Sequence, residues 1–386
     1  MKVLQVSNFF KPSFESGGVA RSVYNISKAL AEKGHNITVF TTNYSMRDVG
    51  VETNKPLNVE GMCVYYFNNL RKFFPFKIPP LPYYAPLIVR KEIKNFDMVH
   101  IHEHRTLLAS IVYFYAKKNG IPYIIQSRGS VLPFYQTRLL KKFYDYCWGN
   151  KILKNAKTVI ALTKEEVKQY ESMGIDKDKI RIIPNSIDCD RKEKLIKGKF
   201  RLDHGFSCNE QIILYLGRLD KIKGLDILVE AFADITKDFD NVKLVIVGHE
   251  SKFMEFLKSL AEKHFIEDKV VFTGPLYGND KFEAYLDADV YVLPSRYETF
   301  PNTVLESCAC GTPVVVTDRC GISDLIKDNV GLVVKCEKTS LKVALVELLE
   351  NDELRDRLSN NCTEFVNNNF NLEKIISKFV EIYKNA

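Results

Sequence analysis

The chain has 386 residues, which is too long for one ordinary hydrophobic core and predicts two domains. Its hydrophobic fraction of 46% and charged fraction of 27% are typical of globular proteins and exclude a disordered or fibrous chain. Residues 1–190 carry 28 Lys and Arg against 16 Asp and Glu, a net charge of +12, whereas the whole chain carries +7. We therefore expect the first half to meet an anionic partner.

Short apolar runs alternate with polar or helical segments along the chain. Five runs occupy the first half, at 3–9, 37–42, 98–102, 123–127 and 158–163. Six more follow in the second half, at 212–217, 243–248, 270–274, 290–294, 313–317 and 331–334. Strands of a parallel sheet have this composition because helices cover both faces. The strand–helix alternation predicts an α/β protein with two doubly wound, Rossmann-like domains.

A change of composition separates the two series. The Pro-Asn turn at 184–185 leads into a charged run without strand or helix pattern. We place the boundary near Asp190, so that the domains span 1–190 and 191–370. The last segment, about 371–386, has the pattern of an amphipathic helix and can pack back on the first domain.

The ends and the cysteines indicate a cytoplasmic protein. No stretch reaches the 18 or so apolar residues that a membrane-spanning helix needs. The start, MKVLQVSNFF, lacks the apolar core and cleavage site of a signal peptide and has the pattern of a strand. Nine cysteines form no CxxC pair, which indicates reduced thiols.

Two carboxylates flank a turn in the second half. Seven residues separate Glu298 from Glu306, and the Phe-Pro-Asn turn at 300–302 between them should begin a helix. Backbone N–H groups at a helix start suit a phosphate. Glu298 is placed to accept hydrogen bonds from sugar hydroxyls, and Glu306 to hold a ribose diol. The alternative is a surface carboxylate and a helix-face carboxylate without a ligand.

These motifs resemble glycosyltransferase family 4, the retaining enzymes of the GT-B fold (glycosyl transferases group 1). The glutamate pair is followed by CGTPVVVTD and GISDLI, as in that family. Further motifs occur in family order over about 1–335: GGVARSVYNISKALAEKGHNITVFTT, DMVHIH, IPNSID, LGRLDKIKGLDILVEAF, LVIVG, VVFTGPL and ADVYVLPS. The resemblance implies a GT-B fold, in which two Rossmann-like domains face a central cleft. It also implies a nucleotide-sugar donor on the C-terminal domain and an acceptor on the N-terminal one.

The catalytic residues implied by the resemblance begin with Arg218 and Lys223, in the loop after the strand 212–217. The matching family residues contact the donor diphosphate, where cations stabilise the charge of the leaving group. Glu298 joins them as the carboxylate nearest the donor sugar. Two solvated cations are the alternative for Arg218 and Lys223.

Glycines contribute to the expected donor site. Gly17 and Gly18 open the helix after the first strand, where the missing Cβ atoms allow close approach to the donor. A tight turn with positive φ is the other reading of this pair. The complete expected donor-binding set is Gly17, Gly18, Gly248, Phe300, Pro301, Asn302 and Glu306.

Two motifs suggest a metal, and we assign none to either. His100, His102 and His104 alternate and would share one face if the strand ran through all three, with Glu103 as a further ligand. We expect His100 to pack inside and His102 or His104 to line the acceptor side. Asp287-Ala288-Asp289 leads into a buried strand, so we assign it no metal ion either.

Arg128 stands where some members of the family have a histidine close to the reacting centre, and other members have a similar Arg-Gly. The substitution puts a histidine-assisted mechanism in doubt, and we count Arg128 among the catalytic residues. It can bind an anionic acceptor or the donor phosphate. A structural salt bridge is the alternative.

Two basic and aromatic stretches remain in the first half. Residues 70–94 and 134–157 each hold six cations against one acid, and the second contains the single tryptophan. Apolar rings beside cations suit a membrane interface or a lipid-linked anionic acceptor. A core-packed helix with a solvated basic face is the other interpretation. Nucleic acid is not expected as a partner, because no known binding module accompanies the charge.

We therefore expect a retaining, metal-independent glycosyltransferase at the cytoplasmic face of the membrane. It needs no cofactor, and a UDP-sugar is favoured over a GDP-sugar as donor. The acceptor is a lipid-linked sugar or a surface glycan, and front-side displacement is favoured over double displacement. The alternatives are a nucleotide-sugar 2-epimerase of the same fold and a non-catalytic, membrane-associated partner.

Overall fold

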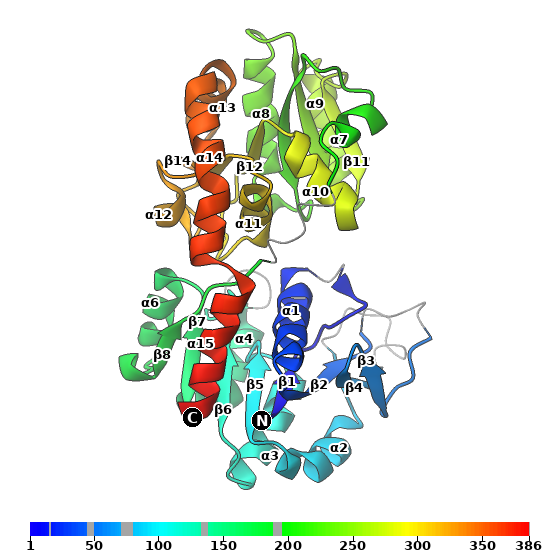
Figure 1. Ribbon diagram of the computed structural model, residues 1–386, viewed down its shortest axis with the longest axis vertical. Helices are drawn as coiled ribbons and strands as arrows, with labels where there is room; N and C mark the ends of the chain where they lie inside the picture. The colour runs from blue at the N-terminus through cyan, green and yellow to red at the C-terminus, as the bar shows by residue number, and fades with distance from the viewer. Residues whose placement is uncertain (15–16, 45–49, 71–79, 133–137, 188–194, 386) are drawn as a thin grey trace. The chain divides into compact units, whose positions relative to one another are not determined.

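A computed structural model describes residues 1–14, 17–44, 50–70, 80–132, 138–187 and 195–385. The chain forms two compact units. Unit 1 contains Met1–Asn185 and Leu372–Ala386, and unit 2 contains Ser186–Asn371 (Figure 1). The boundary expected near Asp190 lies outside the described residues.

Unit 1 contains a sheet of eight strands in the order β3-β4-β2-β1-β5-β6-β7-β8. All neighbours are parallel except β3 and β4. The strands are β1 (Lys2–Val6), β2 (Asn36–Thr42), β3 (Pro56–Val59), β4 (Met62–Phe67), β5 (Met98–His102), β6 (Tyr123–Gln126), β7 (Thr158–Ala161) and β8 (Ile180–Ile182). The apolar runs predicted only five of them. The sequence missed β3, β4 and β8, which form the two sides of the sheet, where β3 and most of β8 are exposed and lack a buried apolar run.

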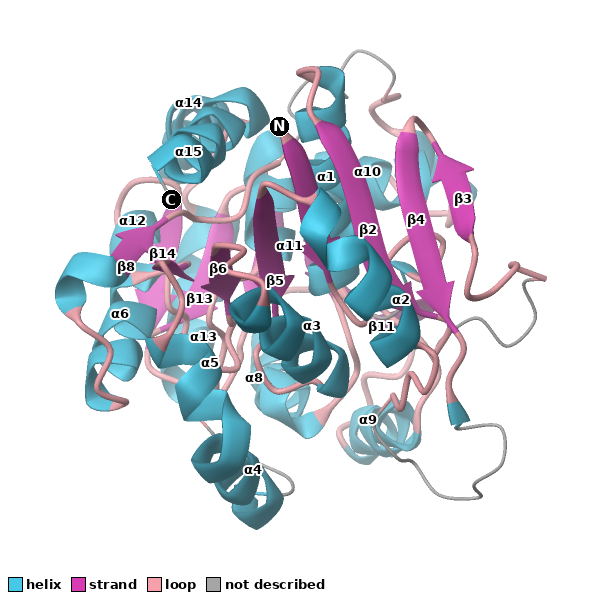
Figure 2. Ribbon diagram, turned by 90° about the horizontal axis from the view of Figure 1, so that it is seen from below, coloured by secondary structure: helices cyan, strands magenta, loops and turns pink. Residues whose placement is uncertain are grey.

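Helices cover both faces of this sheet (Figure 2). They are α1 (Gly18–Glu32), α2 (Ala85–Glu92), α3 (Leu107–Lys118), α4 (Arg138–Tyr144), α5 (Asn150–Lys154), α6 (Lys164–Ser172) and α15 (Leu372–Asn385). Successive strand residues point to opposite faces, so Leu4 packs with α2 and α3 while Val3 packs with α1 and α15. The last helix of the chain, α15, therefore completes the core of unit 1 by burying Ile376, Phe379 and Tyr383.

Unit 2 contains a fully parallel sheet of six strands in the order β11-β10-β9-β12-β13-β14. They are β9 (Gln211–Leu216), β10 (Val242–Val247), β11 (Val270–Gly274), β12 (Val290–Leu293), β13 (Val314–Thr317) and β14 (Gly331–Val334). All six coincide with the predicted runs. The surrounding helices are α7 (Lys199–Asp203), α8 (Leu225–Ile235), α9 (Lys252–Lys263), α10 (Gly278–Asp287), α11 (Asn302–Ala309), α12 (Ser323–Ile326), α13 (Lys338–Glu350) and α14 (Asp352–Asn369).

The strand order locates the expected ligand edge of each unit. In both sheets the chain starts in the middle, moves to one side, and then returns to continue on the other side. The direction reverses between β1 and β5 in unit 1 and between β9 and β12 in unit 2. Ligands of doubly wound sheets bind beyond the carboxyl ends of the strands at such a switch point.

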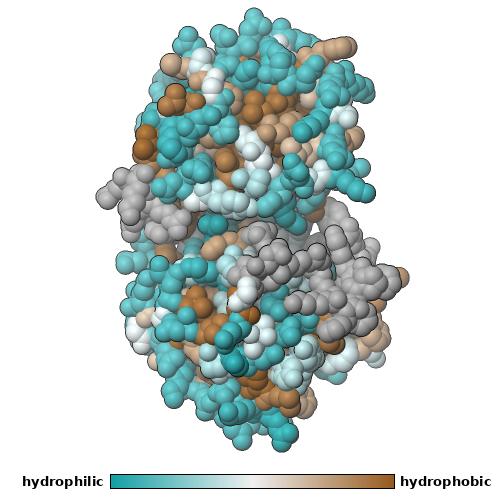
Figure 3. All heavy atoms as spheres, turned by 90° about the vertical axis from the view of Figure 1, so that its right-hand side faces the viewer, coloured by the Kyte–Doolittle hydropathy of each residue, from teal (hydrophilic) through white to brown (hydrophobic). Residues whose placement is uncertain are grey.

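Figure 3 shows one face of the molecule, on which apolar patches interrupt the hydrophilic side chains. Within the described ranges, no helix is both long and apolar enough to cross a bilayer.

Candidate active site

Unit 2 places Lys223 and Glu298 together at the carboxyl end of its central strands. Lys223 ends the short turn Lys221–Lys223 after β9, and Glu298 follows β12, the neighbour of β9. The Lys223 Nζ forms an ion pair with the Glu298 carboxylate, and the two side chains are 13% and 19% exposed. The backbone N–H of Glu298 donates to the Arg319 carbonyl over 3.1 Å, which fixes the strand-like path of this segment. Two predicted catalytic residues therefore meet at the switch point.

The glycine after this lysine explains why the loop lies there. Gly224 has a φ of 71°, and a Cβ at this position would lie 2.0 Å from the Pro294 carbonyl oxygen. Only glycine therefore lets the loop pack against the end of β12. Arg218 lies in the same loop, and its side chain is 71% exposed. Its Nη2 lies 3.7 Å from the Asp220 Oδ2. Its guanidinium is open to solvent and does not join the Lys223–Glu298 pair.

The turn at 300–302 begins α11, as the sequence predicts. Pro301 occupies the N-cap position, and no side chain caps the helix. Backbone N–H groups at a helix start suit an anion, and contact of this turn with the donor stays a prediction. The Phe300 ring is buried and packs edge-on against Phe370 at 5.7 Å, so its side chain belongs to the core. Donor contacts from this turn would come from its backbone.

Glu306 has a different position from Glu298. It lies on the inner side of α11, where its carboxylate accepts hydrogen bonds from the Lys281 Nζ at 2.6 Å and the Tyr285 hydroxyl at 3.4 Å. Both members of the ion pair are buried, and the Lys281 ammonium also lies 4.7 Å from the centre of the Phe282 ring. The carboxylate expected to hold a ribose diol is thus engaged with a lysine that the sequence analysis did not single out.

The glycines of the expected donor site have conformational reasons of their own. Gly17 has a φ of 113°, and Gly18 is the first residue of α1. A Cβ on Gly248 would lie 2.4 Å from the Gly217 carbonyl oxygen. Tight packing and positive φ therefore account for Gly17 and Gly248, and contact with a donor remains a prediction for all three.

The histidines at 100, 102 and 104 are enclosed in unit 1. The His100 Nδ1 shares a hydrogen bond of 2.8 Å with the Tyr383 hydroxyl, the His102 Nε2 pairs with Gln5 Oε1 at 2.7 Å, and the His104 Nδ1 pairs with Ser127 Oγ at 2.8 Å. Burial lowers the pKa of all three imidazoles, that of His104 to about 4. We expected His102 or His104 to line the acceptor side. Their side chains are 1% and 0% exposed, so neither lines an open surface.

The strand ends at His102, so His104 does not continue the face that the sequence pattern suggested. Glu103 interrupts it with a φ of 69°. In the part of the chain that the structure describes, no group of three His, Cys, Asp or Glu side chains could hold a metal ion.

Arg128 follows β6, the neighbour of β5, with a φ of 50°. Its Nε donates to the His102 Nδ1 over 3.1 Å, and its Nη1 donates to the Asn185 Oδ1 over 2.8 Å. Its Nη2 is shielded from solvent and has no hydrogen-bond partner among the described residues. Burial lowers the pKa of the guanidinium to about 10, which leaves it charged at neutral pH. The described contacts include no salt bridge for Arg128, so that alternative reading is not supported.

Glu103 also lies at the carboxyl end of the strands of unit 1, and the sequence suggested it only as a metal ligand. Its backbone N–H donates to the Gln126 carbonyl over 2.9 Å, so it lies at the ends of β5 and β6. The Oε2 atom is shielded and has no partner within the described segments. Burial raises the pKa of this carboxyl to about 7. No sequence signal separates it from an ordinary loop glutamate, because its environment comes from the ends of two strands, β5 and β6, that are separated in the sequence.

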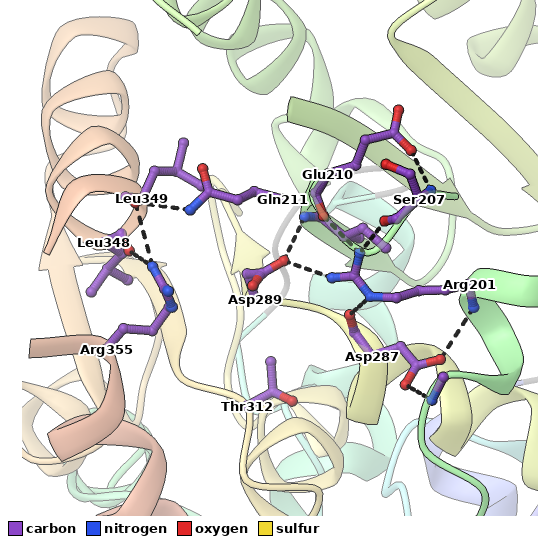
Figure 4. A network of polar contacts seen from close by, with 12 residues as sticks. Arg201, Ser207, Glu210, Gln211, Asp287, Asp289, Thr312, Leu348, Leu349 and Arg355 are labelled. Carbon is purple, nitrogen blue, oxygen red and sulfur yellow. Dashed lines mark hydrogen bonds and ion pairs between the residues drawn. The ribbon is translucent and has the colours of Figure 1, made fainter. Parts of the chain in front are cut away.

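The Asp287–Asp289 pair is part of a structural network (Figure 4). The Asp287 carboxylate accepts hydrogen bonds from the Gly198 N–H at 2.6 Å and the Arg201 N–H at 3.2 Å. The Asp289 Oδ2 accepts from the Ile212 N–H at 2.7 Å and the Arg201 guanidinium at 3.0 Å. These carboxylates anchor α7 to the start of β12 and β9.

Two family models together match most of the chain. "Glycosyltransferase Family 4" matches residues 16–191, and "Glycosyl transferases group 1" matches residues 197–365. A D-inositol 3-phosphate glycosyltransferase from Nocardia farcinica is 30% identical over 89% of this chain and 79% of its own length. The N-acetyl-alpha-D-glucosaminyl L-malate synthase of Bacillus anthracis is 26% identical over 96% of this chain and 94% of its own length.

A solved structure has the same fold. Anabaena HepE in complex with UDP-glucose superposes with a TM-score of 0.79 at 19% identity, covering 100% of both chains. That fold is GT-B, with two Rossmann-like domains. The matched models, the relatives and the two doubly wound sheets show that this chain is an enzyme of glycosyltransferase family 4.

Proposed function

We propose that this enzyme transfers a sugar from a nucleoside-diphosphate donor to a lipid-linked or surface-glycan acceptor, with retention of the anomeric configuration. The Lys223–Glu298 ion pair carries the donor half of the proposal, together with the exposed Arg218 in the same loop as Lys223. A diphosphate at this switch point meets two cations, and the neighbouring carboxylate accepts hydrogen bonds from sugar hydroxyls. The UDP-glucose complex of HepE supports a UDP-sugar over a GDP-sugar.

Front-side displacement fits the state of Glu298. A double displacement needs a free carboxylate to attack the anomeric carbon, but an ammonium in contact with Glu298 reduces its nucleophilicity. In the front-side route, the bond between the anomeric carbon and the phosphate oxygen breaks as the acceptor oxygen bonds to that carbon. The departing phosphate oxygen takes the proton of the acceptor hydroxyl. Arg218 and Lys223 stabilise the charge that develops on the diphosphate.

This scheme uses protein cations and backbone amides at the leaving group, and we propose that it needs no divalent ion. The carboxylates of Asp287 and Asp289 already bind Arg201 and backbone N–H groups, which supports this proposal. Activity should survive a chelator. A strict requirement for manganese or magnesium, restored by titration, would refute metal independence.

An exposed apolar patch on unit 1 supports attachment to the cytoplasmic face of the membrane. We name it the α4 patch, and it consists of Leu139, Leu140, Phe143 and Tyr146, whose exposed fractions are 82%, 69%, 64% and 79%. Lys141 and Lys142 lie among these side chains on α4. Apolar side chains that enter the headgroup region beside cations are typical of peripheral membrane binding. Part of the other basic stretch, residues 71–79, lies outside the described residues.

A screen of nucleotide sugars for protection against thermal unfolding tests the donor assignment. Binding to the native state raises the unfolding temperature in proportion to the logarithm of ligand concentration over its dissociation constant. We expect UDP-sugars to protect more than GDP-sugars. The products of the bound donor should then be analysed without an acceptor, because isomerisation of the donor alone would identify an epimerase instead.

A further inference from the structure

Two polar atoms at the switch point of unit 1 have no hydrogen-bond partner among the described residues. They are the Arg128 Nη2 and the Glu103 Oε2, both shielded from solvent, and they follow the neighbouring strands β6 and β5. A buried polar group without a hydrogen bond is destabilising, so each such atom in a native protein needs an explanation. Both residues also have positive φ, at 50° and 69°, a strained conformation that concentrates at functional sites in proteins.

A continuous hydrogen-bond chain holds the guanidinium in place. The Tyr383 hydroxyl of α15 accepts from the Gln5 Nε2 at 3.2 Å, and Gln5 Oε1 pairs with the His102 Nε2 at 2.7 Å. The His102 Nδ1 then accepts from the Arg128 Nε at 3.1 Å, and Asn185 holds the Nη1. The imidazole must therefore carry its proton on Nε2. Two of the three guanidinium nitrogens have fixed partners, and the third, Nη2, is oriented in advance.

Arg128 and Glu103 attract each other electrostatically but do not form an ion pair among the described contacts. A ligand can therefore satisfy both groups at once. A guanidinium N–H binds a carboxylate or phosphate, and a carboxyl oxygen accepts a hydrogen bond from a hydroxyl. A molecule with an anionic group and a hydroxyl on a neighbouring carbon has both functions.

We propose that Arg128 and Glu103 form an acceptor subsite in unit 1, where Arg128 binds an anionic group and Glu103 binds a hydroxyl of the same acceptor. The inference rests on the proposed sugar transfer and specifies the anionic part of that acceptor as a hydroxy-carboxylate or a polyol phosphate. Arg128 determines specificity, and Glu103 orients the hydroxyl. Tyr383, Gln5 and His102 act as positioning residues.

Calorimetry on the full chain saturated with UDP tests this subsite. The probes are glycerol 3-phosphate, glycerate, methyl phosphate and glycerol, which separate phosphate from carboxylate and the anion from the hydroxyl. We expect R128Q to bind glycerol 3-phosphate, glycerate or both with an affinity lower by about tenfold or more, because the substitution removes one charged hydrogen bond. R181Q is the matched control, since Arg181 is exposed on β8 of the same unit, and it should bind like wild type.

Glu103→Gln provides a second, independent measurement. This variant should bind glycerol 3-phosphate more weakly than wild type does, and its affinity for methyl phosphate should be unchanged. Only glycerol 3-phosphate presents a hydroxyl to residue 103. Equal anion affinities in R128Q and wild type, or an equal loss in R181Q, would overturn the subsite. If R128Q does not fold, an unchanged ratio of glycerol 3-phosphate to methyl phosphate affinity in E103Q would also overturn it. Failure of UDP itself to bind wild type would instead refute the proposed function.

Discussion

The ligand edges of the two units differ in how their polar groups are satisfied. In unit 2 the charges at this edge are paired, Lys223 with Glu298 and Lys281 with Glu306. In unit 1 the corresponding edge contains buried neutral histidines, and within the described segments one guanidinium nitrogen and one carboxyl oxygen have no hydrogen-bond partner. Of the buried side-chain atoms without a partner among the described residues, only Ser295 Oγ belongs to unit 2.

Because of this difference, we expect substitutions at the two edges to affect different properties, stability in unit 2 and ligand binding in unit 1. A paired edge is self-contained, so removal of one partner leaves an uncompensated charge in the protein. An edge with free polar atoms is completed by a ligand, so substitution there should affect binding more than folding. The predictions below test that distinction.

The largest expected effect is on the stability of unit 2. Lys281→Ala should lower the free energy of unfolding by about 3–5 kcal/mol, because the Glu306 carboxylate would remain buried and unpaired. Chemical denaturation measures the change. The double variant K281M/E306L should recover most of the loss, and a single variant as stable as wild type would show that the pair is not buried in solution.

The phosphate cations come next. Arg218→Ala and Lys223→Ala should each raise the activation free energy by about 2–4 kcal/mol, because each removes one cation from the leaving diphosphate. Lys221→Ala is the matched control in the same turn. Steady-state kinetics with the donor found in the thermal screen measure the change in turnover. Unchanged turnover in both variants would contradict the assignment of Arg218 and Lys223 to the diphosphate.

Acid should destabilise unit 1 through its histidines. The folded-state pKa of His104 is lowered to about 4 from 6.5, so the unfolded state binds more protons between these values. The contribution, up to about 3 kcal/mol, is present above pH 6.5 and is lost as the pH falls toward 4. Glu103 has the opposite sign, since its raised pKa of about 7 favours the folded state below pH 4.5 and that contribution is lost as the pH rises to 7.

Denaturation of wild type and H104Q across pH 4–7 separates these terms. The variant should lose less stability on acidification than wild type. Parallel curves for the two proteins would show that His104 titrates normally.

Membrane attachment is a smaller effect that concerns unit 1 alone. Each cation near an anionic surface contributes about 1 kcal/mol, so the double reversal K141E/K142E should weaken vesicle binding by at least about 2 kcal/mol. Co-sedimentation with anionic and neutral vesicles, at low and high salt, measures it. A reversal of Lys258 and Lys263 on α9 of unit 2 is the control. Equal sedimentation of wild type and K141E/K142E would refute the α4 patch as a membrane surface.

The smallest expected effect is at the far end of the hydrogen-bond chain. Tyr383→Phe removes the hydroxyl that contacts His100 and Gln5 and should cost about 1 kcal/mol of stability. If α15 positions Arg128, the KM for the acceptor should rise while the KM for the donor stays constant. A parallel change in both constants would indicate a general loss of structure instead.

The strand–helix alternation, and with it the fold class, could be predicted from the sequence alone. Apolar runs revealed every strand of unit 2, because a strand buried on both faces needs a continuous apolar composition. The apolar runs did not predict the edge strands β3 and β8, because half-exposed strands carry no such run. Ordered motifs also indicated the family, and they located Lys223 and Glu298, which the fold brings together.

The pairing of the polar groups could not be predicted without the three-dimensional fold. Lys281 and Glu306 lie 25 residues apart on separate helices, and Arg128 reaches His102 and Asn185 from another strand end. No local pattern encodes such contacts, because they depend on which elements become neighbours in the sheet. Burial has the same origin: the pKa of Glu103 rises because the folded chain buries this carboxyl at the ends of β5 and β6, which HIHEH alone does not show.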